Sequence, residues 1–427
     1  MHDDSKIERA ISSAFNGGRY SRRIFLRRAG KGMVVAGSAL SLPAILAACG
    51  IGPGGSPTGG GAPSSAPVGG GETAGVLNFA NWPLYIDQDD DGNSPTIQQF
   101  EESTGVDVTY TEAIEDNSSF FGTVQPALAA GQDTGYDIIV MTDWMIGNMA
   151  RLGYLEPLDL ARDVPNFLDN ADQVYLERSY DPDNKYSVPW QSGITGIAYN
   201  PALVDEEITS MAQLLDPELI EKYCGQIGMF VEMRDSMSFA MLYNGVTPAD
   251  ATIEDAEAAQ QVLLDQAPCV RDYYGNEYAQ ALADGSLAIT MAWSGDVFQL
   301  QFDNPDLQFV VPEEGAILWT DNMAIPKGAQ HPNAALAMMD YIYDPEVAAQ
   351  VAEYVNYITA VPGAKEIILQ HAADAESDED REYLETVANS PLVFPTQEML
   401  DNLYSYKVLD EDEERQWNEM FQEVVQG

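Results

Sequence analysis

Val76-Leu77-Asn78-Phe79-Ala80 is a short apolar run that predicts a β-strand, and Asn81-Trp82-Pro83-Leu84-Tyr85 follows it directly. The chain then alternates between helical and extended patterns. The expected elements are, in order, a helix over 97–104, a strand over 106–110, a helix over 118–130 and a strand over 136–140. Strands that alternate with helices indicate an α/β fold, with a mainly parallel sheet covered by helices on both faces.

The second half of the chain repeats this alternation after a crossing segment over 193–199. The expected strands are 225–231, 269–274 and 287–292, and the chain then returns through 322–326 to a helix over 333–343. Two α/β lobes joined by two crossings leave a cleft between them, and many binding proteins close such a cleft on a ligand by hinge motion. We expect lobe 1 at 76–194 and 320–367, and lobe 2 at 195–319 and 368–427.

The N-terminal residues carry signals for export. Arg22-Arg23 precedes an uncharged stretch, 32–48, that is too short and too rich in small residues for a comfortable membrane span. This pattern is typical of a twin-arginine signal. The stretch ends in Leu46-Ala47-Ala48-Cys49, which resembles a lipoprotein signal-peptidase box, and Cys49 would become the acylated first residue. The alternative is an ordinary membrane anchor with a chance cysteine. The predicted segments are a signal peptide over 1–48 and a flexible Gly/Ser/Pro tether over 49–75.

The charge of the chain restricts its partners. The sequence has 68 acidic and 20 basic residues, for a formal net charge of −48. Such a surface repels nucleic acid and anionic lipid headgroups and raises the local concentration of cations. Nucleic acid is therefore excluded as a partner. Adaptation to a saline exterior is the general explanation of the acidity, so net charge alone does not identify a ligand.

Two cysteines, Cys224 and Cys269, remain after Cys49. In an oxidising exterior such a pair suggests one disulfide. A metal site or a catalytic thiol would need histidine partners, and only His331 and His371 lie outside the signal peptide. Two free buried thiols are the alternative.

Several short motifs, in a fixed order and spacing, carry a family resemblance. They are Asn81-Trp82-Pro83-Leu84-Tyr85, Tyr136-Asp137-Ile138-Ile139-Val140 with Thr142, Glu232-Met233-Arg234-Asp235, Ala292-Trp293-Ser294-Gly295-Asp296, Glu313-Glu314-Gly315-Ala316 with Trp319-Thr320-Asp321, and Asn356-Tyr357. From about Leu77 to its C-terminus the chain resembles the periplasmic spermidine/putrescine-binding proteins, which have the type II periplasmic binding fold. The resemblance implies a monomeric, non-enzymatic substrate-binding protein without cofactor or metal. It would capture putrescine or spermidine and deliver it to the permease subunits of an ABC importer, while its lipid anchor holds it at the outer face of the cytoplasmic membrane.

The resemblance also implies roles for individual side chains. A polyamine alternates methylene stems with positive charges, so its site needs aromatic walls and carboxylates at the amine spacing. The implied walls are Trp82, Tyr85, Trp293, Trp319 and Tyr357, with Trp144 where the family often has tyrosine. The implied ammonium acceptors are Asp235, Asp296 and Asp321, with Glu232 as a fourth, and Thr142 offers a hydroxyl. Trp82, Tyr85, Thr142, Asp143 and Trp144 are also candidates by position, because ligands bind beyond the carboxyl ends of parallel strands.

One departure from the family pattern affects the first lobe. Pro83 and Leu84 stand where the family often places a polar or acidic residue between tryptophan and tyrosine. Asp143 is then the obvious first-lobe carboxylate, and we expect it to accept the far ammonium of a longer amine. The alternative is that Asp143 only caps the helix that begins near Trp144.

Other functions remain open at this point. The cleft is also compatible with another cationic amine, a sugar or an amino acid, or with a carboxylate-dependent extracellular hydrolase. The sequence has no GxSxG, HExxH or phosphate-loop motif, which disfavours catalysis. Asp87-Gln88-Asp89-Asp90-Asp91-Gly92 matches the first half of a calcium loop, but Gln98 stands where the bidentate glutamate is needed. We interpret it as a solvated acidic turn.

Overall fold

The computed structural model describes residues 69–71, 75–89, 91–176 and 178–426. Cys49, the predicted signal peptide over 1–48 and most of the predicted tether over 49–75 lie outside the described residues. Within these ranges no helix combines the length and the apolar character needed to cross a membrane.

The first lobe is built on three parallel strands. In the order β2-β1-β3 they are β2 (Val106–Glu112), β1 (Gly75–Asn81) and β3 (Ile138–Thr142), and they carry α3 (Pro95–Thr104), α4 (Asn117–Ala129) and α5 (Asp143–Arg151). Local sequence defines these helices. Ser94 caps α3 by accepting from the Ile97 amide, and Gly105 ends that helix with a φ of 74°. Asp116 caps α4 by accepting from the Ser119 amide.

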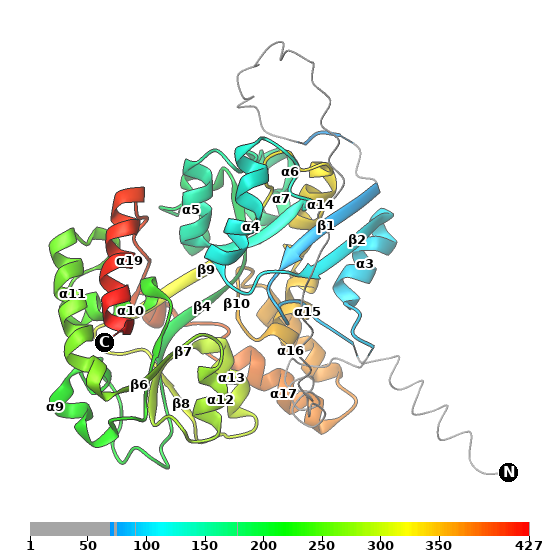
Figure 1. Ribbon diagram of the computed structural model, residues 1–427. Coiled ribbons are helices and arrows are strands. Elements are labelled where there is room, and N and C mark those ends of the chain that lie inside the picture. The colour runs from blue at the N-terminus through cyan, green and yellow to red at the C-terminus, as the bar shows by residue number, and fades with distance from the viewer. Residues whose placement is uncertain (1–68, 72–74, 90, 177, 427) are drawn as a thin grey trace, which may run out of the picture.

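Two long strands join the lobes. β4 (Ser187–Tyr199) and β9 (Ala316–Ala324) are buried along their whole length and pair with each other in antiparallel fashion. β9 also pairs with β3 of the first lobe, and β4 pairs with β7 of the second. The main strand order is therefore β2-β1-β3-β9-β4-β7-β5-β6. Figure 1 shows β4 and β9 running between the two lobes.

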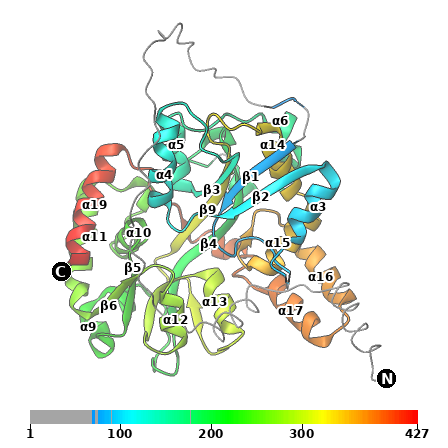
Figure 2. The ribbon, with the colours of Figure 1, turned by 45° about the vertical axis from the view of Figure 1, so that its right-hand side comes forward.

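The second lobe repeats the parallel arrangement. β5 (Ile227–Phe230) lies between β6 (Val270–Tyr274) and β7 (Ile289–Trp293), and the helices are α10 (Met233–Tyr243), α11 (Ile253–Gln266), α12 (Tyr278–Ala283), α13 (Ser294–Gln301) and the C-terminal α19 (Glu411–Gln426). A capping box of Thr252 and Asp255 begins α11. In both views α19 lies beside α11 at the outer edge of this lobe (Figures 1 and 2). The predicted two-lobed α/β fold is confirmed.

The remaining elements are short or cover the sheet. The short strands are β8 (Gln308–Val310) and β10 (Ile358–Thr359), which pair with β4, and β11 (Leu403–Tyr404), which pairs with β9. The short helices are α6 (Leu160–Asp163), α7 (Pro165–Asn170), α8 (Ala212–Leu215), α9 (Pro217–Ile220), α18 (Gln397–Leu400) and the 3-10 turns η1 (Gln173–Tyr175), η2 (Pro182–Asn184), η3 (Glu221–Tyr223), η4 (Pro248–Asp250) and η5 (Ala267–Cys269).

Four helices occupy the part of the chain around the expected lobe boundary. After α14 (Pro332–Ile342) and α15 (Pro345–Val355) come α16 (Ala364–Asp374) and α17 (Asp378–Asn389). The expected lobe boundary between 367 and 368 falls inside α16, which packs against both α15 and α17. A continuous helix therefore occupies this position. The chain contacts the second lobe again before α19, where Tyr406 donates to Asp235 and Lys407 donates to the Ala251 carbonyl.

The two cysteines among the described residues are joined. Cys224 and Cys269 form a disulfide with a Cα–Cα distance of 4.1 Å. Each lies just before a strand of the second lobe, β5 and β6, and these strands are parallel neighbours. The Gly225 amide also donates to the Cys269 carbonyl at 2.8 Å, so the bond links the starts of the two strands.

Candidate functional site

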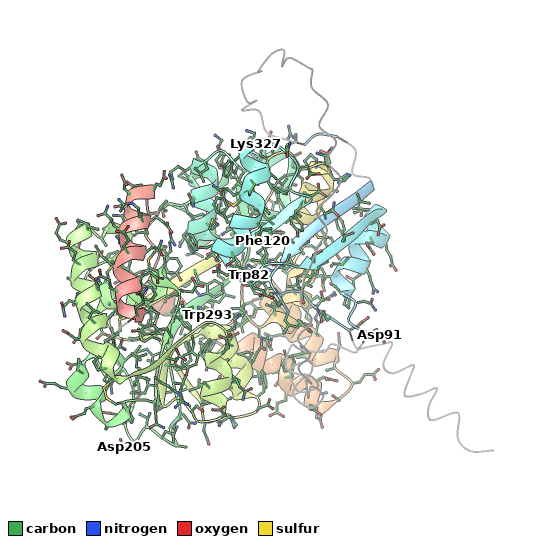
Figure 3. The ribbon with its side chains drawn as sticks, in the orientation of Figure 1. Trp82, Asp91, Phe120, Asp205, Trp293 and Lys327 are labelled. Atoms are coloured by element: carbon green, nitrogen blue, oxygen red, sulfur yellow. A yellow bond between two sulfur atoms is a disulfide. The ribbon has the colours of Figure 1, made fainter. Side chains whose placement is uncertain are left out.

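A cavity of about 190 Å³ lies in the cleft between the lobes. It is formed at the carboxyl ends of the strands, as the position rule for α/β sheets predicts. Figure 3 shows Trp82 of the first lobe and Trp293 of the second near the centre of the molecule. The predicted site residues that line the cavity are Trp82, Tyr85, Thr142, Trp144, Glu232, Asp235, Trp293, Asp296, Trp319, Asp321 and Tyr357.

The aromatic walls are fixed by contacts with the scaffold. The Trp82 indole donates to the Val140 carbonyl at 3.0 Å, which ties the first wall to the end of β3. The Tyr357 ring contacts Tyr85 at 5.8 Å and Trp319 at 5.5 Å between centroids. On the second lobe the Trp293 ring packs on Phe230 with centroids 4.5 Å apart. Offset and edge contacts of this kind hold rings in place.

Two glycines make room for these rings. A Cβ on Gly193 would lie 2.3 Å from the Trp319 ring, its register partner on β9. A Cβ on Gly295 would lie 2.7 Å from the Tyr357 ring. Both distances are far below van der Waals contact, so these positions of the rings require glycine.

Asp321 is the most completely positioned carboxylate. It is the register partner of Thr142 across β9 and β3. The Thr142 hydroxyl donates to its Oδ1 at 2.7 Å and the Tyr85 hydroxyl donates to its Oδ2 at 3.0 Å. The Asn117 amide in turn donates to the Thr142 hydroxyl oxygen at 2.8 Å, which leaves the Thr142 proton for Asp321. Burial raises the pKa of Asp321 to about 6, despite these hydrogen bonds.

Asp235 and Asp296 are held by hydroxyl groups in the same way. Both Thr195 and Tyr406 donate to Oδ1 of Asp235, at 2.6 and 2.7 Å. Burial raises the pKa of Asp235 to about 6. Asp296 accepts from the Tyr357 hydroxyl at 2.8 Å and from a second buried tyrosine, Tyr278, at 3.0 Å.

Glu232 adds a fourth acid on the second lobe. It precedes α10 as its N-cap residue. Burial, followed by the charges of Asp235 and Asp116, raises the pKa of Glu232 to about 7. Several acids therefore share one cavity, and the charge of Asp235 makes ionisation of Glu232 less favourable.

Asp143 does not line the cavity. Its side chain is buried, and α5 begins at this residue. Its Oδ1 accepts from the Trp144 amide at 2.6 Å and its Oδ2 accepts from the Thr320 amide at 3.3 Å. The structure therefore does not bring Asp143 together with the other predicted site residues, because both of its oxygens accept from backbone amides. The alternative to ligand contact fits this geometry, because the Asp143 carboxylate accepts from backbone amides at the start of α5 and in β9.

Sequence reasoning missed several lining residues. Glu115 and Asn117 follow β2 at its carboxyl end, so the position rule could have identified them. Glu115 is exposed and places a first-lobe carboxylate at the cavity. Arg234 lay within a quoted motif without an assigned role, and Tyr406 had no sequence signal.

The acidic segment after β1 serves the fold. Asp87 accepts from the Ser94 hydroxyl at 2.9 Å, from the Thr96 amide at 3.1 Å and from the Gln350 amide at 2.7 Å. Asp89 accepts from the Asn93 amide at 2.9 Å. Across the described ranges, no group of three or more histidine, cysteine, aspartate and glutamate side chains is arranged to hold a metal ion.

Known proteins share this fold and much of this chain. Residues 96–382 match the family described as bacterial extracellular solute-binding protein. A putrescine-binding periplasmic protein of Pseudomonas aeruginosa is 25% identical over 367 residues, which are 82% of this chain and 92% of the relative. A spermidine/putrescine-binding periplasmic protein of Escherichia coli is 28% identical over 327 residues, covering 75% of this chain and 89% of the relative.

A solved structure agrees with these relatives. The spermidine/putrescine ABC transporter substrate-binding protein of Streptococcus pneumoniae has a TM-score of 0.67 and 27% identity, covering 82% of this chain and 98% of that one. The family match begins in α3 and ends in α17, so it includes both crossing strands and most residues that line the cavity, but not Trp82, Tyr85 or Tyr406. This chain therefore belongs to the bacterial extracellular solute-binding proteins.

Proposed function

We propose that this protein captures a polyamine cation outside the cytoplasm and delivers it to the permease of an ABC importer. One observation carries the proposal: three hydroxyl-bonded carboxylates, Asp235, Asp296 and Asp321, line one cavity together with indole and phenol rings. The relatives that are described as putrescine- or spermidine-binding support it.

The chemistry of the cavity fits an amine better than a neutral solute. A sugar also stacks on aromatic rings, but it has no charge to compensate several carboxylates in one cavity. An ammonium group both donates hydrogen bonds to carboxylates and interacts favourably with aromatic faces. The methylene stem between two ammonium groups then covers the apolar surface of the rings.

A thermal-shift panel tests the class of ligand. Putrescine, spermidine, glucose and glutamate are each added to the purified protein, since a ligand at one hundred times its Kd stabilises the folded state by about 2.7 kcal/mol. The amines are expected to raise the Tm and the other two solutes are not. A shift with glucose and none with either amine would contradict the proposal.

The raised carboxylate pKa values predict pH-dependent binding. Asp321 and Asp235 titrate near 6 and Glu232 near 7 in the free protein, and a cation binds their ionised forms. Affinity should fall by about tenfold per pH unit below 6 for each carboxylate that must ionise. Calorimetric titration with putrescine between pH 5 and pH 8 measures this, and a constant Kd over that range would contradict it.

The stability of the free protein should rise as the pH falls, whereas its affinity for the amine should fall. These carboxylates have folded-state pKa values above their unfolded values, so the folded state binds more protons between pH 4 and pH 7. Their contribution to the free energy of unfolding is therefore largest at low pH and is lost as pH rises through 6 to 7. Bound putrescine should restore it, which urea unfolding at pH 5 and pH 7.5 with and without amine would show.

Replacing Glu115 tests the first-lobe acid. Because Glu115 is exposed, Glu115→Gln should weaken putrescine binding only about two- to fivefold, in line with the small free energy of a solvated charge pair. Asp143→Asn is the matched control, because its Oδ1 can still accept from the Trp144 amide and affinity should not change. Calorimetry gives the Kd of putrescine for both variants. A larger loss of affinity in Asp143→Asn than in Glu115→Gln would show that Asp143 contacts the ligand.

Export and anchoring complete the proposal. The twin-arginine signal at Arg22-Arg23 directs export, and acylated Cys49 holds the protein at the outer face of the cytoplasmic membrane. Family membership supports a location outside the cytoplasm. In fractionated cells Cys49→Ala should release the protein from the membrane, and an unchanged membrane fraction would contradict lipid anchoring.

A further inference from the structure

The disulfide between Cys224 and Cys269 lies at the surface of the second lobe. Cys224 is exposed and Cys269 is half-buried. Cys224 directly follows the turn η3, and Cys269 is the last residue of the turn η5. The strands β5 and β6 begin just after them, whereas the cavity lies at the other ends of these strands. A reagent in solution can therefore reach Cys224 in the folded protein without entering the cleft.

Hydrogen bonds that do not involve sulfur hold the backbone around this bond. The Gly225 amide donates to the Cys269 carbonyl at 2.8 Å, and the Arg271 guanidinium donates to the Gly225 carbonyl at 3.4 Å. The Ala288 amide donates to the Gln226 carbonyl at 2.8 Å, which ties the same turn to the residue before β7. These contacts keep the starts of the two strands together whether the sulfurs are bonded or not.

The elements next to the cysteines are also packed independently of the bond. β5 is buried along its whole length, and Ile227 and Gly228 pair with β7 on the side away from β6. Before Cys269, the buried Gln266 side chain donates to the Leu214 carbonyl at 2.8 Å, which fixes the end of α11. A disulfide stabilises mainly by limiting the freedom of the unfolded chain. Opening this one should therefore lower stability without unfolding the lobe.

The two sulfurs have different surroundings, and these assign them different roles. Thiol–disulfide exchange begins when a thiolate reaches a sulfur of the other molecule, so its rate depends on access. Cys224 is the more accessible residue, whereas Cys269 packs against the hydrophobic core. Apolar surroundings also disfavour a thiolate. Cys224 is therefore the thiol that reacts first, and Cys269 is the thiol that completes the exchange.

We propose that Cys224 and Cys269 form a dithiol–disulfide site that a small disulfide oxidises in the folded protein. The Cys224 thiolate attacks one sulfur of the oxidant, the S–S bond of the oxidant breaks, and one thiolate leaves. The Cys269 thiolate then attacks Sγ of Cys224 and releases the second thiolate. The two leaving thiolates take up the two protons that the cysteines lose, so the oxidant is reduced by two electrons to two thiols.

The site gives the bond a place in the export route proposed above, and this consequence rests on that route. The twin-arginine signal at Arg22-Arg23 belongs to a pathway that carries folded chains, and the cytosol keeps thiols reduced. The chain would then cross the membrane as a folded dithiol. The bond would close outside, on a structure that already holds both cysteines in place.

Reoxidation of the wild type tests the reaction in the folded state. The protein is reduced with dithiothreitol without denaturant, freed of the reductant and given oxidised glutathione under anaerobic conditions. Near-ultraviolet circular dichroism should show the folded state throughout, and trapping with N-ethylmaleimide followed by mass spectrometry gives the rate of thiol loss. Adding about 1 M urea should change this rate less than about twofold, whereas a reaction through the unfolded chain would accelerate at least about fivefold. Loss of the folded signal on reduction, or the larger acceleration, would overturn the inference.

Single-cysteine variants test the order of the thiols and are matched controls for each other. In Cys269→Ala the adduct of Cys224 with glutathione cannot be resolved and should accumulate. In Cys224→Ala the adduct of Cys269 should form about tenfold or more slowly. Equal rates, or a faster reaction at Cys269, would overturn the assigned order.

A second measurement covers variants that do not fold. The reduced wild type is treated with a limiting amount of iodoacetamide, and peptide mapping should then find Cys224 alkylated ahead of Cys269. Preferential alkylation of Cys269 would contradict the order. None of these readouts involves an amine, so their failure leaves the proposed function standing, and a cleft that binds no amine leaves this inference standing.

Discussion

Asp321→Asn is expected to weaken putrescine binding by about ten- to a hundredfold. A charge-assisted hydrogen bond between an ammonium group and a buried carboxylate contributes roughly 1.5–3 kcal/mol. Asparagine keeps one oxygen to accept from Thr142 or Tyr85, so the scaffold around the site changes little. The loss should therefore appear in the affinity rather than in the fold, and calorimetry measures it.

A second buried aspartate provides the control for this variant. Asp137 lies just before β3, whereas Thr142, the partner of Asp321, ends that strand. Asp137 accepts from the Asn78 and His331 amides and is 1% exposed. Asp137→Asn should lower stability without changing the Kd for putrescine. Wild-type affinity in Asp321→Asn would remove Asp321 from the site.

Removing the disulfide should cost about 2–4 kcal/mol of unfolding free energy. Cys224 and Cys269 are 45 residues apart, and opening a loop of this size restores considerable entropy to the unfolded chain. Urea unfolding of the Cys224→Ala/Cys269→Ala protein against the wild type measures the loss. Putrescine affinity should stay within about twofold, because the bond lies at the amino ends of β5 and β6 and the cavity lies at their carboxyl ends.

Mass spectrometry checks the bond itself. Without reduction, neither Cys224 nor Cys269 should react with an alkylating agent, and both should react after reduction. Two alkylatable thiols in the non-reduced protein would contradict the disulfide and with it the stability prediction.

The sequence predicted the fold well because the patterns that indicate strands and helices depend on residues that are close together in the chain. Apolar runs such as 76–80 become strands in a buried sheet, and the intervening helical patterns become α3 and α4 at nearly the expected residues. The lobe boundary expected at 367/368 falls inside α16, because nothing in the local pattern separates α16 from the helices on either side.

The candidate site was predictable only where strand ends or the family resemblance indicated it. Asp143 is not among the residues that line the cavity, because a place next to a strand end does not reveal side-chain direction and its carboxylate accepts from backbone amides. The stacking of Arg234 on Trp144 joins residues 90 positions apart in different lobes, and Tyr406 reaches Asp235 from beyond β11. Such contacts depend on how the lobes pack, which no local pattern contains.

A calorimetric titration with two matched ligands tests the central claim most directly. Putrescine and butane-1,4-diol have the same four-carbon stem, but only the diamine carries charges for Asp235, Asp296 and Asp321. At pH 7.5 the protein should bind one putrescine per chain and should bind the diol at least about a hundredfold more weakly, since each ammonium contact contributes roughly 1.5–3 kcal/mol. Equal affinity for the diol, or no binding of putrescine, would contradict the assignment of this cleft to a cationic amine.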